Sequence, residues 1–167
     1  MKLSFEQKMF GIARIALGWT FLWAFMDKLW GLGFSTTADK SWLVGASPTT
    51  GFLKFATAGP LSSVFSSLAG QGWVDWLFMI GLLGIGAALI LGVGVRIAGY
   101  AGALLVLLMF SAAIPYFAEG SHNPILDEHI IYAAILLAFT RVKVGRWLGC
   151  GEKWSKTDLV KEHPILE

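Results

Sequence analysis

Residues 76–118, WLFMIGLLGIGAALILGVGVRIAGYAGALLVLLMFSAAIPYFA, contain a single charged side chain, that of Arg96. Between Asp75 and this arginine lie 20 uncharged residues, and 22 more follow it before Glu119. Each stretch is long enough to cross a hydrocarbon core of about 30 Å as an α-helix. The tight sequence LGVGVR (91–96) joins them, so we predict an antiparallel hairpin of two membrane-spanning helices at about 73–94 and 96–117.

The composition of the whole chain supports a membrane protein. Hydrophobic residues make up 56% of the 167 residues and charged residues 14%, against about 25% charged in an average soluble domain. A soluble domain of this size could not bury so much apolar surface. The net charge of +2 is too small to indicate a nucleic-acid partner. The lone Cys150 excludes a disulfide framework and a dithiol redox relay.

Two further crossings are predicted, at about residues 9–30 and 124–142. We therefore expect an all-α polytopic membrane four-helix bundle over residues 1–145 and a polar cytoplasmic tail over 146–167. Small residues on the middle helices are predicted to allow close helix packing. They are Gly84, Ala88 and Gly92 on the second helix and Ala98 and Gly102 on the third.

The first and last helices carry charges close to the membrane core. Only 12 residues separate Arg14 from Asp27, and 12 separate Glu128 from Arg141. Twelve helical residues span about 18 Å, so some of these charges reach the hydrocarbon. A charge there is costly unless it snorkels, pairs or faces the bundle interior. For Arg14, snorkelling and pairing with an anion inside the bundle are both open.

The connection between the first two helices, residues 31–72, is too apolar for a solvated loop. Two short helical segments are expected in it, GFLKFATA (51–58) and PLSSVFSSLA (60–69), separated by Gly59 and Pro60. Neither can span a bilayer, so we expect them to lie in the outer interface or to form a re-entrant cap.

Lysine and arginine positions predict that both termini lie inside the cell. With this orientation only Lys28, Lys40 and Lys54 lie outside, and ten basic residues lie inside. The ten are Lys2, Lys8, Arg14, Arg96, Arg141, Lys143, Arg146, Lys153, Lys156 and Lys161.

Polar residues gather at the outer ends of the predicted helices. They are Asp27, Lys28, Asp75, His122, Asp127, Glu128, His129 and Tyr132. Glu128, His129 and Tyr132 share one helix face, because the spacings are i, i+4 and i, i+3. A carboxylate, an imidazole and a phenol around an apolar cavity suit proton-coupled chemistry on a quinone.

We therefore predict catalytic roles for Asp27, Glu128, His129 and Tyr132, and quinone contacts from Trp23, Asp127 and Tyr132. Asp27 is expected to face the bundle interior, within reach of His129 or Glu128. The alternative is structural: Asn123 and Pro124 start the last helix, with Asp127 and Glu128 in its first turn. By the same alternative Asp27 and Lys28 form an interfacial pair, and Asp75 belongs to a helix start.

Only His129 of the three histidines lies near a helix, so no haem or metal is expected from this chain alone.

Four segments carry a resemblance to a known family: RIALGWTFLWAFMDKLWGLGF (14–34), GASPTTGFL (45–53), residues 73–99, and NPILDEHIIYA (123–133). Here the sequence resembles the DoxX/DoxD family of small four-helix membrane proteins, and within it the DoxD-type subunits of thiosulfate:quinone oxidoreductase. The resemblance implies a prokaryotic plasma-membrane protein that helps to oxidise thiosulfate to tetrathionate and to pass the electrons to quinone, with a second oxidoreductase subunit as partner. It also marks Asp27, Asp127 and His129 as family features.

Two functions stay open at this point. The first is the quinone-linked oxidoreductase subunit, for which the net-acidic outer face is a difficulty, because it repels the thiosulfate dianion. The anion site would then need Lys28, Lys40, Lys54 or the partner. The second is a non-enzymatic membrane scaffold or small transporter that recruits a redox partner. Membrane lipid is a partner in either case, and a homo-oligomer is compatible with both.

Overall fold

The computed structural model describes residues 3–118 and 123–167, and over these residues the chain is all-helical, as predicted. Three helices are long and apolar enough to cross a membrane: α1 (Phe5–Trp30), α4 (Gly72–Leu91) and α5 (Val95–Ala112). The fourth predicted crossing corresponds to α6 (Glu128–Phe139), which is apolar but has only 12 residues. The chain is therefore a membrane-embedded helical protein.

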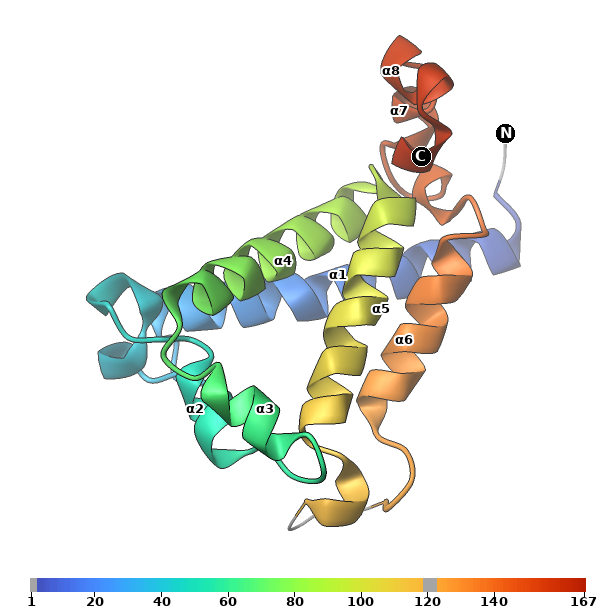
Figure 1. Ribbon diagram of the computed structural model, residues 1–167. Coiled ribbons are helices and arrows are strands. Elements are labelled where there is room, and N and C mark those ends of the chain that lie inside the picture. Colours follow the sequence, from blue (N-terminus) through green and yellow to red (C-terminus); the bar gives the residue numbers. More distant parts are fainter. Residues whose placement is uncertain (1–2, 119–122) are drawn as a thin grey trace.

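The four helices are arranged as two pairs. Helix α1 packs along α4, and α5 packs along α6. Figure 1 shows the two pairs diverging from the end of the molecule that holds the α4–α5 turn, the start of α1 and the chain after α6. We call this the tail end, and the opposite end the loop end. The turn lies where the sequence predicts it, but α4 and α5 diverge from it, because each has its main contact with another helix.

Glycines allow the close approach within each pair. A Cβ on Gly86 of α4 would lie 2.7 Å from the backbone nitrogen of Leu22 in α1. A Cβ on Gly99 of α5 would lie 2.8 Å from the carbonyl oxygen of Leu136 in α6. The prediction that Gly84 is one of the small residues for close packing on α4 is therefore wrong: Gly84 faces open space, and Gly86 makes the contact with α1.

Two helix boundaries differ from the prediction. Helix α5 ends at Ala112 instead of about residue 117, because Pro115 lacks an N–H and disfavours helical backbone before it. A 3₁₀ turn, η3 (Pro115–Phe117), follows. Helix α6 begins at Glu128 instead of about residue 124, because the side chain of Asp127 accepts a hydrogen bond from the N–H of His129 and caps the helix there.

The connection between α1 and α4 contains the two short helices that the sequence predicts, α2 (Thr50–Phe55) and α3 (Ser62–Ser67). Two 3₁₀ turns, η1 (Ala38–Lys40) and η2 (Trp42–Val44), precede them. Figure 1 shows α2 and α3 at the open side between the diverging pairs. The N–H of Ala58 donates to the carbonyl of Ala112, 2.8 Å away, and so ties this connection to the end of α5.

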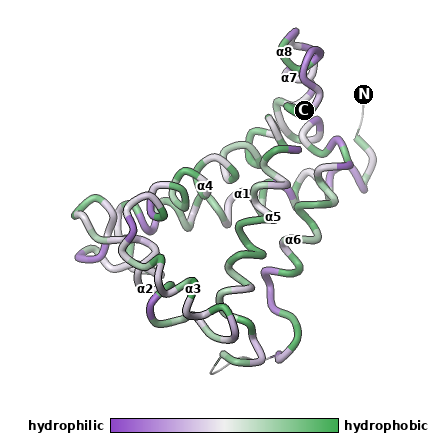
Figure 2. The backbone as a smooth tube through the Cα atoms, in the orientation of Figure 1, coloured by the Kyte–Doolittle hydropathy of each residue, from purple (hydrophilic) through white to green (hydrophobic). Residues whose placement is uncertain are grey.

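The apolar surface fits a lipid environment. Leu77 of α4 and Leu104 of α5 are 66% and 60% exposed, and Figure 2 shows mostly hydrophobic residues along the helices, with hydrophilic ones toward the ends. The chain after α6 forms four short elements at the tail end. They are η4 (Val144–Arg146), α7 (Gly151–Trp154), α8 (Asp158–Glu162) and η5 (Pro164–Leu166).

Candidate functional site

A carboxylate–imidazole pair stands at the start of α6. Asp127 Oδ1 accepts the N–H of His129 over 3.0 Å, and Asp127 Oδ2 lies 2.8 Å from His129 Nδ1. Both side chains are 22% exposed. Asp127 thus caps the helix, whereas the structural alternative places the helix start at Asn123 and Asp127 in the first turn. Asp127 also fixes the orientation of the imidazole. With Nδ1 engaged, the second ring nitrogen, Nε2, is the atom that can exchange a proton with another group.

The other two predicted residues of α6 lie beside this pair. Tyr132 is one turn further along the helix and packs against the hydrophobic core. Glu128 is exposed in the first turn, where a carboxylate interacts favourably with the helix dipole. The structure therefore keeps Asp127, Glu128, His129 and Tyr132 together on one turn and a half of helix.

Asn123 does not cap α6; its side chain accepts from the N–H groups of Ile125 and Leu126.

Asp27 has a different set of partners. Its side chain is 1% exposed. It accepts hydrogen bonds from the N–H of Phe34 (3.2 Å) and from the N–H and hydroxyl of Ser35 (2.9 and 2.6 Å). The ring of Trp23 packs edge-on against Phe34, with centroids 5.0 Å apart. Asp27 and Trp23 together hold the chain that leaves α1 against the end of that helix.

Asp75, in the first turn of α4, holds the same connection at a second point. It accepts hydrogen bonds from the hydroxyls of Ser47 (2.8 Å) and Thr49 (2.6 Å), and it is 8% exposed. Both hydroxyls donate to the same carboxylate oxygen, Oδ1, and hydrogen bonds to a charged acceptor are strong, so Asp75 holds this segment in place. This role of Asp75 is not among those predicted from the sequence. The hydroxyl side chains of SPTT (47–50), which can donate to a carboxylate, are the signal that could have indicated it.

The predicted contact of Asp27 with His129 or Glu128 is not formed. Figure 1 shows the end of α1 and the start of α6 in separate parts of the molecule. The reason is the helix pairing: α1 packs along α4, and α6 packs along α5. The predicted outer cluster is therefore divided into an α1–α4 part and an α6 part. His122, also predicted in it, lies outside the described residues.

Arg14 lies fully buried at the tail end, and its partners are backbone carbonyls. One terminal nitrogen, NH1, donates to the carbonyls of Leu89 and Ile90 at the end of α4. The other, NH2, donates to the carbonyls of Trp147 (3.0 Å) and Leu148 (3.1 Å), beyond α6. The last carbonyls of a helix have no partner within it and form the negative end of its dipole. Arg14 therefore neither snorkels nor pairs with an acid; it joins α1, α4 and the chain after α6.

Among residues 3–118 and 123–167 no three histidine, cysteine, aspartate or glutamate side chains are placed to hold a metal ion. Comparison of the chain with family models, with curated proteins and with solved structures found no match.

Proposed function

We propose that the chain is the membrane-embedded subunit of a quinone-linked oxidoreductase, and that the Asp127–His129 pair at the start of α6 delivers protons to the quinone. The observation that carries the proposal is the 2.8 Å contact between Asp127 Oδ2 and His129 Nδ1. An imidazole can accept a proton on one ring nitrogen and donate it again, which suits a proton-transfer role. The carboxylate holds the ring so that Nε2 is presented to the substrate.

The chemistry assigned to this chain is proton transfer. When a quinone becomes a hydroquinone, the ring takes up two electrons and each carbonyl oxygen takes up one proton. In our proposal the electrons come from thiosulfate through a partner subunit, two thiosulfate ions joining as tetrathionate with the loss of two electrons. His129 donates one proton to a carbonyl oxygen, Tyr132 supplies a second donor, and exposed Glu128 exchanges protons with water. Exposed apolar side chains such as Ile131 give a quinone a surface to lie on.

A second function, a non-enzymatic membrane scaffold that recruits a redox partner, has its own support. Asp27, Asp75 and Asp127 each accept hydrogen bonds from the chain around them. Hydrogen bonds of this kind, from neighbouring backbone and hydroxyl groups to a buried carboxylate, are typical of carboxylates that stabilise a fold. In the scaffold proposal the Asp127–His129 pair only caps α6.

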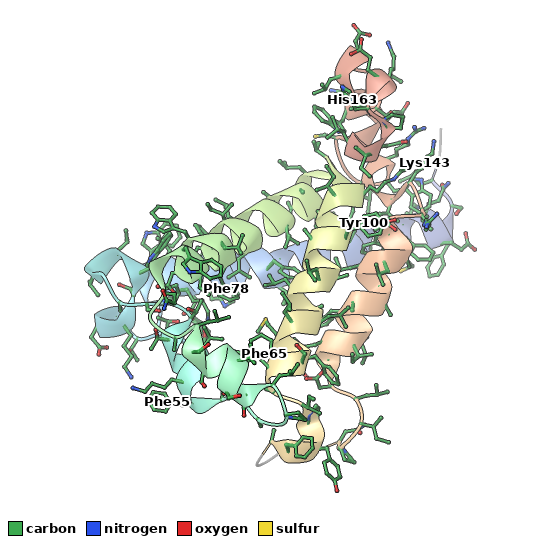
Figure 3. The ribbon with its side chains drawn as sticks, viewed as in Figure 1. Phe55, Phe65, Phe78, Tyr100, Lys143 and His163 are labelled. Carbon is green, nitrogen blue, oxygen red and sulfur yellow. The ribbon has the colours of Figure 1, made fainter. Side chains whose placement is uncertain are left out.

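Thiosulfate-dependent quinone reduction in membranes with and without this chain tests the oxidoreductase. Turnover should depend on the chain, and H129A should lower it by about 100-fold, since a positioned acid or base contributes about 10²–10⁴ to a rate. Activity is normalised to folded, inserted protein. The matched control is H163A, which removes a histidine at the other end of the molecule (Figure 3). Wild-type turnover in H129A would contradict proton delivery by His129, and turnover that does not depend on the chain would contradict the oxidoreductase and favour the scaffold.

A further inference from the structure

A solvent-open recess at the tail end is lined by four cationic residues. It lies between the start of α5 and the chain that follows α6, and it is small, with a volume of about 40 Å³. The four residues are Arg96, Arg141, Lys143 and Arg146. We call it the basic recess. Figure 3 shows Lys143 at this end, with Tyr100 of α5 nearby.

One acidic residue, Glu167, reaches into the basic recess. Its Oε1 accepts a hydrogen bond from Arg146 Nε over 2.7 Å, and its Oε2 lies 3.6 Å from Lys143 Nζ. Its main-chain oxygen accepts the N–H of Arg96 over 3.0 Å. The cationic side chains that line the recess therefore outnumber the one carboxylate side chain that lines it. Like charges held this close repel each other, and a further anion relieves the repulsion.

The backbone adds to the attraction for an anion. Helix α5 starts in the recess, and its N-cap residue, Gly94, has no side chain that could accept from the first N–H groups. These N–H groups and the helix dipole favour a negative group at this point. The main-chain oxygen of Glu167 now accepts one of them, the N–H of Arg96. Hydrogen bonds from N–H groups and guanidinium groups to an anionic oxygen are among the stronger ones in proteins.

We propose that the basic recess is a binding site for a phosphate group, which enters in competition with Glu167. A phosphate has several oxygens, so it can accept from the Arg96 N–H and from two guanidinium groups at once, and arginine recognises such groups through paired hydrogen bonds. The recess adjoins exposed apolar side chains of two membrane helices, such as Leu91 and Ile97. Both the headgroup of an anionic phospholipid and a soluble phosphate compound carry the required chemistry.

The test is a binding titration of the full chain in detergent, read by native mass spectrometry. One arm titrates phosphatidylglycerol, the other inorganic phosphate. The double variant R141Q/R146Q should bind about tenfold more weakly, since each exposed or half-exposed charge pair contributes up to about fivefold. The control K153Q/K156Q removes two exposed lysines of the tail outside the recess and should bind like the wild type.

E167Q gives an independent arm, because it removes the competing charge and keeps the shape of the side chain. It should bind about threefold more tightly than the wild type. Binding of phosphatidylglycerol alone identifies a lipid headgroup, and displacement of the lipid by inorganic phosphate identifies a soluble phosphate compound. Equal affinity in R141Q/R146Q and K153Q/K156Q would overturn the proposal. If R141Q/R146Q fails to fold, unchanged affinity in E167Q overturns it.

Discussion

At the scale of single residues, the buried charges of Arg14 and Asp27 are stabilised by hydrogen bonds with nearby backbone and hydroxyl groups. Arg14 donates to carbonyls that a helix end leaves without partners, and Asp27 accepts from N–H groups of the chain that follows its own helix. The sequence predicts that both charges lie at or inside the edge of the membrane. It cannot predict their partners, because backbone atoms are present at every residue and leave no mark in a pattern of side chains.

Replacing Arg14 should destabilise the protein strongly. R14A removes the hydrogen bonds to one buried and three partly buried carbonyls, and a hydrogen bond to a charged group contributes about 1.5–3 kcal/mol. We expect R14A to lower the free energy of unfolding by about 3 kcal/mol, and R14K to recover only part of it, because an ammonium cannot reach both carbonyl pairs. Denaturant unfolding in detergent micelles measures this. The control is K8A, an exposed cation on the same helix. Equal stabilities of R14A and K8A would contradict the assigned role.

Asp27 should matter for stability and not for turnover. In D27N an amide NH₂ replaces one of the oxygens that now accept from Phe34 and Ser35. We expect a loss of about 1–3 kcal/mol in the free energy of unfolding and wild-type turnover per folded molecule. D39N, at an exposed carboxylate in the same connection, should be neutral. Turnover that falls in D27N at unchanged stability would restore the catalytic role that the sequence suggests.

At the scale of elements, the number and type of the helices follow from charge spacing, but the face that each helix presents does not. Helix α4 is apolar on all sides, so its sequence does not distinguish a face toward α1 from a face toward lipid. This is why a regular stripe through Gly84 is predicted although Gly86 makes the contact. The start of α6 is missed for a related reason: Asn123 and Asp127 are both good caps, and only one begins the helix.

Alanine substitutions at the two glycines should have opposite effects. In G86A the new methyl group would meet the backbone of α1, and such overpacking typically destabilises by about 1–3 kcal/mol. In G84A the methyl group meets open space, and alanine stabilises a helix by up to about 1 kcal/mol relative to glycine. Thermal unfolding of both variants in the same detergent measures the difference. If both variants shift the melting temperature in the same direction, the α1–α4 contact is not the one described.

At the scale of the whole molecule, the pairing of helices decides which polar residues meet. The sequence places Asp27 and His129 near the same face of the membrane, but it does not tell which helix packs against which. Since α1 pairs with α4, the carboxylate of Asp27 and the imidazole of His129 belong to separate parts of the loop end. The Asp127–His129–Tyr132 group could be predicted because it is local to one helix.

The start of α1 and the chain after α6 lie at the tail end, and the basic residues predict that this end faces the cytoplasm. Exposed Cys150 reports on the tail end, and S63C in a C150S background reports on the loop end. In intact cells a membrane-impermeant maleimide should label S63C and should reach Cys150 only after permeabilisation. Labelling of Cys150, but not of S63C, in intact cells would reverse the orientation.

The contacts of Arg14 also determine when, during translation, its hydrogen bonds can form. Its guanidinium leaves the ribosome long before the carbonyls that it binds: those of Leu89 and Ile90 come some 75 residues later, and those of Trp147 and Leu148 more than 130 residues later. At about 5–20 residues per second, the second wait lasts about 7–27 s. During that time the first helix carries an incompletely bonded charge, so α1 can settle to its final depth only after the chain beyond α6 has been synthesised.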